Sequence, residues 1–456
     1  MTNSSKNVLI IELNEFNVEL LEAAVSQIPL AALEKVLSFT KTHYKTQDRY
    51  NSGYLEPWVQ WVSIHTGVSA KTHRIKHLGD VPDLGFNQCW ETLSQHDITT
   101  GIWGVMNGAR KTASNTLFFL PDPWTFSEEA SPKKLQGLLS LPRYISKHYQ
   151  DLSVFTLIKK GLSLIKFIMG SGACGKIFLE TIDLLKNLKH FGKKHFVFIS
   201  YFDVISTLLF IQYQKKFKAR CAILFLNSLA HLQHHHWHSG PTTLTPELSY
   251  GLKKINQLLA LLLEQYKEQA IIVHNGLSQM NTNHEKPWVL YRQKNPLRFF
   301  QAIELAPQQV EQHMTHDGHA FFADPEACLN AYALLKRARM NHKPLFHVEK
   351  NSQDPCKLFY QLCFTDDLDL VQDREITFSF DQKEYPFFEH FDKMVTRTGR
   401  HIPVGTVYSN IIPFADQIYN HNFNTYVFNY LRPDLFPLRE NIEQALFEHA
   451  GEEEIA

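Results

Sequence analysis

Apolar residues in this chain fall into two patterns, short β-branched runs and longer stretches with helical spacing. The run at 8–11 (Val-Leu-Ile-Ile) is bounded by polar residues and predicts a strand buried in a parallel sheet. A polar turn at 12–17 leads into a predicted helix over Val18–Gln27, with Asn17 as its N-cap. Further strands are expected at 99–105, 195–200, 222–226 and 270–273, and a long helix at 246–268. This alternation predicts an α/β fold with a mostly parallel central sheet flanked by helices, in which ligands collect at the carboxyl ends of the strands.

Five segments of different character follow one another along the chain. Residues 1–125 and 195–290 are the N-terminal and middle parts of the predicted α/β core. Between them, 126–194 shows helical spacing punctuated by prolines, which predicts a helical insertion or cap. Residues 291–395 mix strand and helix signals, including a helix expected from Asp324 to about Ala338, and 396–456 return to the core. The acidic tail at 452–454 is expected to be a frayed terminus.

Composition narrows the classes of protein to which the chain can belong. The 456 residues are 44% hydrophobic, enough for a large buried core. Lysine plus arginine equals aspartate plus glutamate, 46 each, so no net field attracts nucleic acid, and no nucleic-acid partner is expected. Six widely spaced cysteines form no CxxC pair, and no secretory signal is recognised at the start of the sequence. A reducing compartment, and hence a cytoplasmic location, is expected.

The stretch Val154–Met169 is the longest apolar region, and Lys159, Lys160 and Lys166 interrupt it. It is too short and too charged to span a membrane, and its spacing predicts an amphipathic helix. Such a helix is expected to pack on its own domain. The alternative is that it lies on a membrane surface.

Histidines are concentrated at 231–238, where five of eight positions carry an imidazole. Imidazole is the commonest protein ligand for zinc-like metals. On a helix, His231, His234 and His238 share one face. His235 and His236 lie off this face and are expected to be exposed, and so is His238, at the end of the run. A second stretch, Arg-Thr-Gly-Arg-His-Ile-Pro-Val-Gly at 397–405, contains His401.

A fourth segment reads Glu-Pro-Trp-Val-Gln-Trp-Val-Ser-Ile-His-Thr-Gly at 56–67. Together with the first strand and the two histidine stretches, it follows an order that resembles the alkaline phosphatase superfamily, specifically its type I phosphodiesterase and nucleotide pyrophosphatase branch. The resemblance places the first metal ligand at Asn14, between Glu12 and Glu15. It places the nucleophile at Pro57 or, if the alignment is shifted by one residue, at Glu56. Proline cannot attack, whereas Glu56 could coordinate a metal or attack as a carboxylate.

The remaining ligand positions of the family align with imidazoles and amides. Its middle Asp and His pair falls on Ala230 with His234 or on Asn227 with His231, and both registers stay open. The next pair falls on His274 and Asn275, and the closing His-x-x-x-Gly motif is intact at His401. Asn14 and Asn275 would be weak neutral ligands, or simply caps at strand ends.

The loss of acidic ligands argues against a two-metal phosphoryl-transfer site, which needs several carboxylates to neutralise two dications. The histidines and carboxylates that remain indicate a one-metal, histidine-rich site that favours a zinc-like divalent ion. Its expected imidazole ligands are His401, either His234 or His231, and His274. Glu12, Glu15 or Glu56 is expected to serve as an acidic ligand or as the general base. Asn107 and Gln279 also lie at predicted strand ends and are candidates for lining the cleft, or for ordinary loop hydrogen bonds.

Two hypotheses follow from the resemblance. The first is a divergent metal-dependent hydrolase or transferase acting on a phosphate or sulfate ester, either of a small molecule or of a lipid- or glycan-linked group. The second is a catalytically inactive relative that serves as a binding or scaffold protein, since the expected nucleophile and three aspartates are replaced.

Overall fold

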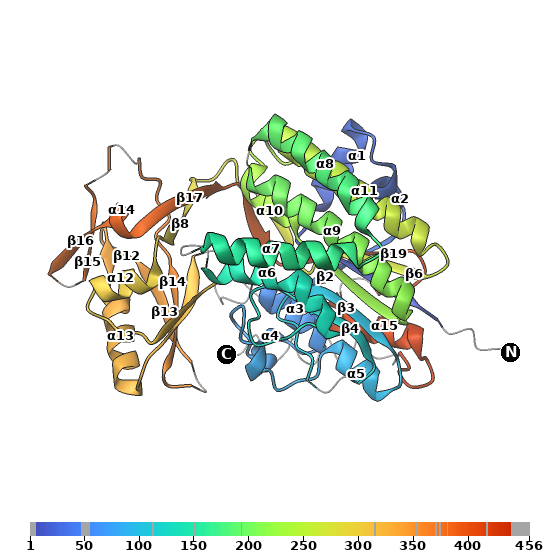
Figure 1. Cartoon of the computed structure of the whole chain (residues 1–456), viewed down its shortest axis with the longest axis horizontal. Coiled ribbons are helices and arrows are strands. Elements are labelled where there is room, and N and C mark those ends of the chain that lie inside the picture. The colour runs from blue at the N-terminus through green and yellow to red at the C-terminus, as the bar shows by residue number, and fades with distance from the viewer. Residues whose placement is uncertain are drawn as a thin grey trace.

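An eight-stranded sheet forms the centre of the larger part of the molecule (Figure 1). The computed structural model describes residues 6–46, 55–111, 114–148, 152–192, 194–313, 316–351, 354–369, 372–373, 375–380, 382–415 and 418–438. The acidic tail at 452–454 lies outside these residues. In spatial order the strands are β20 (Ile418–Tyr419), β2 (Thr40–Lys45), β19 (Val404–Ser409), β6 (Ala270–His274), β1 (Val8–Leu13), β5 (Cys221–Leu226), β3 (Thr100–Val105) and β4 (Thr116–Pro121).

Strand pairing in this sheet is parallel except at β19. Strands β6, β1, β5, β3 and β4 pair parallel with their neighbours, and β2 pairs parallel with β20. Strand β19 is antiparallel to both β6 and β2. The predicted α/β class with a mostly parallel central sheet is therefore confirmed.

The apolar run of β1 is continuous because helices cover both faces of the sheet. Leu9 and Ile11 belong to one hydrophobic core and Val8 and Ile10 to the other. The first face is covered by α1 (Val18–Gln27), α2 (Ala31–Leu37), α9 (His195–Phe217) and α11 (Pro246–Gln265), and the second by α3 (Pro57–Thr66), α5 (Cys89–Gln95) and α15 (Phe423–Leu431). As predicted, Asn17 caps α1, and its Oδ1 accepts the N–H of Leu20 at 2.8 Å.

The segment before α9 is helical, in three successive helices. These are α6 (Gln136–His148), α7 (Val154–Met169) and α8 (Cys174–Phe191), and Figure 1 shows α7 lying across the near side of the molecule. The predicted helix over Val154–Met169 is confirmed. One side of α7 packs inward through Phe167, while several apolar residues on its other side are exposed.

The strand predicted at 195–200 is wrong, because these residues begin the 23-residue helix α9. A six-residue window rich in aromatic and β-branched residues cannot separate a buried strand from a buried helix. Among the described residues, α9 is the one helix long and apolar enough to cross a membrane. Since 72% of its most apolar window is buried, α9 has the character of a core helix.

Residues from about 288 to 397 build a second body with its own core, at the left of Figure 1. One four-stranded antiparallel sheet contains β13 (Phe346–Lys350), β14 (Lys357–Leu362), β10 (Asp317–Phe321) and β9 (Gln309–Gln312). A second contains β12 (Lys343–Pro344), β11 (Arg339–Met340), β15 (Thr377–Phe380) and β16 (Lys383–Pro386). The helices of this body are α12 (Pro296–Ala302), α13 (Pro325–Arg337) and α14 (Phe387–His390). The helix predicted from Asp324 to about Ala338 is confirmed as α13, and Asp324 is its N-cap.

Two short ribbons join this body to the core. Strand β8 (Trp288–Gln293) pairs with β17 (Phe391–Arg397), and β7 (Ser278–Asn281) pairs with β18 (Gly399–Ile402). The second ribbon brings the closing motif back over the carboxyl ends of the central strands. The remaining elements are α4 (Ala70–His73), α10 (Ser228–His236) and three short 3₁₀ turns at Val81–Asp83, Lys133–Leu135 and Asn420–Asn422.

Candidate metal centre

Glu15 occupies the turn that follows β1, between the ends of its neighbours β5 and β6. Its backbone is left-handed, with φ of 59°, and its N–H donates to Asn275 O at 2.9 Å. A left-handed conformation is uncommon for a residue with a side chain and is held only where the surroundings enforce it. Gln233 of α10 enforces it here, because its Nε2 donates to Glu15 O at 2.8 Å and its Oε1 accepts Asn17 N–H at 2.9 Å.

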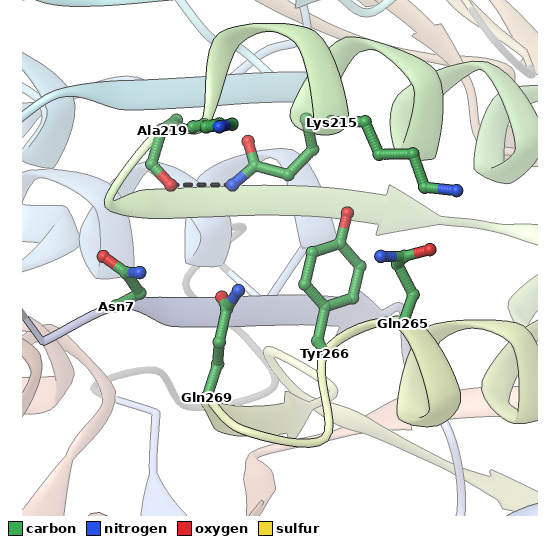
Figure 2. A pocket seen from close by; sticks show the side chains of 8 residues that line it. Asn7, Lys215, Ala219, Gln265, Tyr266 and Gln269 are labelled. Atoms are coloured by element: carbon green, nitrogen blue, oxygen red, sulfur yellow. Dashed lines mark hydrogen bonds between the residues drawn. The ribbon is translucent and has the colours of Figure 1, made fainter.

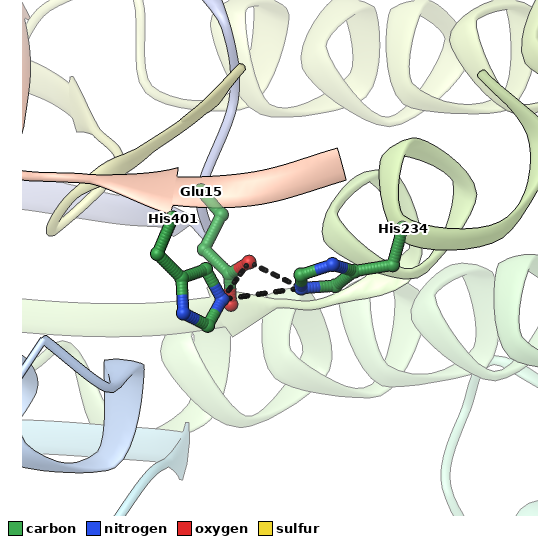
Figure 3. A group of neighbouring side chains, drawn as sticks. All are labelled: Glu15, His234 and His401. Carbon is green, nitrogen blue, oxygen red and sulfur yellow. Dashed lines mark hydrogen bonds and ion pairs between the residues drawn. The ribbon is translucent and has the colours of Figure 1, made fainter. Parts of the chain in front are cut away.

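The carboxylate of Glu15 meets two imidazoles from distant parts of the chain (Figure 3). Glu15 Oε2 lies 2.9 Å from His234 Nε2, at the end of α10, and 3.0 Å from His401 Nε2, in β18. The two Nε2 atoms are 3.2 Å apart. Among the described residues this is the one group of three or more His, Cys, Asp or Glu side chains whose ligand atoms all lie within 4.8 Å of one another.

The other nitrogen of each imidazole is held by a backbone carbonyl. His234 Nδ1 lies 3.1 Å from Gly399 O, and His401 Nδ1 lies 3.1 Å from Leu55 O. A carbonyl accepts only from N–H, so in the neutral rings the proton sits on Nδ1 and the Nε2 lone pair points into the centre. Metal-binding histidines are oriented in this way. Two imidazoles and one carboxylate also form a donor set typical of catalytic zinc, which leaves a fourth position open. The residues present therefore fit a zinc-like ion.

Amide groups fix the carboxylate of Glu15. Asn14 Nδ2 donates to Glu15 Oε1 at 2.8 Å, and Gln279 Nε2 donates to Glu15 Oε2 at 2.5 Å. Gln279 Nε2 also donates to Ala230 O at 3.1 Å. Glu15 and Gln279 are both almost completely buried. The carboxylate is thus preorganised before any ligand arrives.

Burial and mutual electrostatics shift the pKa values of Glu15, His401 and His234 in different directions. Burial raises the pKa of Glu15, but His401 and His234 outweigh it and bring that pKa well below the ordinary range. Burial lowers the pKa of His401, but Glu15 reverses the effect and leaves it raised. For His234 burial prevails over Glu15, and its pKa is lowered. Glu15 therefore favours its charged form, while His401 is easier and His234 harder to protonate than an ordinary imidazole.

Glu56 stands beside this group at the N-terminus of α3. Its Oε2 lies 3.5 Å from His401 Nδ1, and its side chain is about one third exposed. Burial raises the pKa of Glu56; Asp317 and Glu15 act in the same direction, whereas His401 and Arg397 oppose it. A carboxyl group with a raised pKa is suited to carry a proton.

Arg397 is a functional candidate that sequence reasoning missed. It ends β17, and its guanidinium lies 4.5 Å from the centroid of the Trp288 ring. Burial lowers its pKa, and Glu56, Glu15 and Asp317 raise it. Its position in the closing motif, four residues before His401, was the available signal. It is thus a cation within electrostatic range of Glu56, Glu15 and Asp317.

Thr398 joins the closing motif to α10. Its Oγ1 donates to Gln233 O at 2.9 Å and accepts Trp237 N–H at 3.0 Å, while its own N–H donates to His234 O at 2.8 Å. These bonds hold His234 and His401 in one frame. Trp237 itself is fully buried.

The structure places His231 and His274 outside the Glu15, His234 and His401 group. His231 Nε2 lies 3.3 Å from His195 Nδ1 at the start of α9. His274 ends β6 with its ring stacked on Phe423 at 4.3 Å between centroids, and its Nδ1 lies 3.4 Å from Tyr44 OH.

The predicted amide and acid residues mainly make structural hydrogen bonds. Asn14 Oδ1 accepts the indole N–H of Trp61 at 2.8 Å, and Asn275 bridges Phe16 O and Thr406 N. Glu12 pairs with buried His65 at 2.7 Å. Asn107 Oδ1 accepts Gly79 N–H, and its Nδ2 donates to Trp58 O and His77 O. Of the predicted site residues, His234, His401, Glu15, Glu56, Gln279 and Asn14 are brought together.

The rest of the histidine run is more buried than predicted. His238 is exposed, but His235 and His236 are half-buried. His235 packs on His231, with centroids 4.4 Å apart, and His236 packs on Phe196 at 4.9 Å. The neighbouring helix α9, which the sequence did not predict, covers this side of α10.

A cavity of about 310 Å³ lies at the other ends of the central strands, away from Glu15, His234 and His401 (Figure 2). It is lined by Asn7, Gln214, Lys215, Lys218, Ala219, Gln265, Tyr266 and Gln269. Asn7, Ala219 and Gln269 precede β1, β5 and β6, so this cavity lies at the amino ends of the strands. Ligands of parallel α/β sheets bind at the carboxyl ends, where Glu15, His234 and His401 meet.

Comparison with known proteins gives distant likenesses. No family model matches the chain, and no curated protein matches it. Human ectonucleotide pyrophosphatase/phosphodiesterase 5 is similar with a TM-score of 0.46 and 9% identity, covering 94% of this chain and 95% of that chain. Its murine counterpart, solved inactive with AMP, gives 0.44 and 9% at the same coverage. Phosphonoacetate hydrolase from Sinorhizobium meliloti, solved with phosphonoacetate, gives 0.43 and 11%, again at that coverage.

These neighbours are alkaline phosphatase superfamily members. With TM-scores below 0.5 and identities of 9% to 11%, they carry no information about the reaction of this chain.

Proposed function

We propose that this chain is a divergent metal-dependent hydrolase of phosphate or sulfate esters, with a single zinc-like ion held by Glu15, His234 and His401. The observation that carries the proposal is the orientation of the two imidazoles. Each presents Nε2 to the Glu15 carboxylate while a backbone carbonyl holds its Nδ1. A purely structural ion pair needs one imidazole beside a carboxylate, whereas a metal site needs this convergence of lone pairs.

The residues around the centre supply the other requirements of ester hydrolysis. An ion bound there would act as a Lewis acid toward an ester oxygen. Arg397 would bind and orient the anionic group, because a guanidinium matches phosphate and sulfate oxygens with paired N–H donors. Glu56 would take a proton from the attacking water and release it later, since its pKa is raised and it lies beside His401.

Water is the proposed attacking group because Ser63 and Thr66, the hydroxyl residues of α3 among the described residues, are engaged elsewhere. Pro57 begins α3, where the family resemblance places the nucleophile. Ser63 and Thr66 lie further along α3, and their hydroxyls bond within the helix or to His73. Attack by water would leave no covalent intermediate on the chain.

Metal analysis of the purified full-length chain tests the binding part of the proposal. Wild-type protein is expected to bind one equivalent of zinc and to melt at a higher temperature when zinc is present. His234→Ala and His401→Ala are expected to lose both effects. His235→Ala is the matched control, because this neighbouring imidazole lies outside the centre, and it should bind as wild type does. Absence of zinc binding by the wild type would refute the proposal.

Activity is then measured with nitrophenyl phosphate monoesters and diesters and nitrophenyl sulfate. The zinc-loaded wild type is expected to hydrolyse one of these esters, and Glu56→Gln to bind zinc with turnover reduced about 100-fold or more. The alternative function is an inactive relative that binds a ligand beside the same three residues. The replacement of the expected nucleophile by Pro57 favours that alternative. Stoichiometric zinc with no turnover on any ester would support it.

A further inference from the structure

Helices α7 and α8 expose a row of apolar side chains. Phe155 is 77% exposed and Phe178 is 64% exposed, although phenylalanine is normally buried. We call the exposed apolar residues of these two helices the outer face; they are Val154, Phe155, Ile158, Leu162, Ile165, Met169, Phe178, Leu179, Ile182 and Leu185. Scattered apolar residues are common on protein surfaces, but so many on one side of each of two successive helices mark an interaction site.

The outer face belongs to well-packed helices. Its members recur three or four residues apart, as one side of a helix requires. The opposite sides carry Phe167 in α7 and Ile177 and Leu184 in α8, which are buried against the rest of the molecule. One side of each helix is therefore already buried in the folded protein, and the outer face is the side that remains exposed.

Basic residues accompany the outer face, and acidic residues turn away from it. No aspartate or glutamate occurs from 152 to 179, whereas Lys159, Lys166 and Lys176 in this stretch are exposed. The two acidic residues of α8 pair with Lys254 of α11, at 3.0 Å from Glu180 and 2.7 Å from Asp183. The surroundings of the apolar side chains are thus positively charged.

Apolar residues bordered by lysines fit the boundary between the acyl chains and head groups of an anionic membrane. A second copy of the same face would bring like charges together, which disfavours self-association through it. We propose that the outer face docks this protein on the surface of an anionic phospholipid membrane. None of its residues belongs to the metal centre, so docking does not depend on the proposed hydrolysis.

Vesicle flotation of the full-length chain tests the proposal. Wild-type protein is expected to float with vesicles of phosphatidylcholine and phosphatidylglycerol, less with phosphatidylcholine alone, and less at high salt. Phe155→Glu combined with Leu162→Glu should reduce the bound fraction about tenfold or more, because two charges would enter the apolar layer. Lys159→Glu combined with Lys166→Glu should weaken binding to the anionic vesicles. Leu329→Glu on α13 is the matched control, since Leu329 is also exposed, and it should float as wild type does.

Two results would overturn the proposal. One is wild-type protein that remains with neither kind of vesicle. The other is a stable dimer in light scattering that Phe155→Glu with Leu162→Glu converts to monomer, because a second copy would then cover the outer face. Equal melting temperatures of wild type and variants exclude loss of folding as the cause of lost flotation.

Discussion

The guanidinium of Arg397 stacks on the indole of Trp288, 4.5 Å from the ring centroid, at the end of the ribbon formed by β8 and β17. Stacking fixes the plane of the guanidinium without using its N–H groups, so these groups stay available for an anion. It also explains how a cation can be held beside Glu56 and Glu15 without a direct ion pair to either among the described contacts.

Replacing Arg397 by lysine should therefore damage ester turnover more than stability. Lysine keeps the charge but loses the paired donors and the stacking, so kcat/KM is expected to fall about 10- to 100-fold, the equivalent of one or two charged hydrogen bonds. Arg400→Lys is the control, because Arg400 forms an exposed pair with Glu285 at 3.0 Å. Steady-state kinetics of the two zinc-loaded variants make the comparison, and equal losses would contradict the role of Arg397.

Zinc affinity should decrease as the pH falls. In the proposed centre zinc takes the lone pair of His401 Nε2, and Glu15 leaves the pKa of His401 raised above its ordinary value of 6.5. Below that raised pKa a proton must be displaced, so the dissociation constant is expected to increase about tenfold for each further pH unit. Competition titrations with a zinc indicator between pH 6 and pH 8.5 measure this slope. A constant affinity across the range would show that His401 is not a ligand.

Gly399→Ala should disturb the centre through packing alone. A Cβ at this position would lie 2.3 Å from Gln279 Oε1 and 2.8 Å from Gln233 O, both on residues that position Glu15. The expected cost is about 1 to 3 kcal/mol of unfolding free energy together with weakened zinc binding. Gly161→Ala in α7 is the control: a Cβ there meets nothing within 4 Å, and alanine should stabilise the helix by about 0.5 to 1 kcal/mol. Urea unfolding and zinc titration of both variants test the difference.

Asp203 should make stability depend on pH. It lies in α9 and accepts the N–H of Ser228 at 2.8 Å at the start of α10, and burial raises its pKa from 3.8 to about 6. The folded state therefore holds this proton more tightly than the unfolded state. The resulting stability is complete below pH about 4 and is lost as the pH rises through about 6, a change on the order of 3 kcal/mol.

Asp203→Asn removes that titration while keeping the shape of the side chain. The unfolding free energy of wild type minus that of the variant should fall across pH 4 to 7, as measured by urea unfolding at successive pH values. Parallel curves for the two proteins would contradict the assignment.

Periodicity predicted the central strands and missed α9 for a physical reason. In β1, β5 and β6 short apolar runs end at polar turns, and both faces of these strands are covered. The start of α9 has the same local composition, but it belongs to a helix of 23 residues whose apolar residues fall on most sides because most of the helix is buried. Only its length distinguishes it from a strand.

Motif order predicted His234 and His401 but could not separate them from His231 and His274. The choice depends on the phase of α10, which begins at Ser228 and turns His231 toward His195. It also depends on which face of the sheet the last residue of β6 meets, and His274 faces Tyr44 and Phe423. Glu15 was expected as an acidic ligand or general base, but the left-handed turn that aims it at both imidazoles is a tertiary effect of Gln233 and Asn275.

The three groups of the metal centre enter the chain in the order Glu15, His234, His401. During synthesis the first strand leaves the ribosome long before the closing motif, and the carboxylate has no second imidazole until nearly the whole chain has emerged. A nascent or prematurely terminated chain therefore cannot assemble the complete group of Glu15, His234 and His401, and metal capture by the proposed centre would report that translation has passed residue 401.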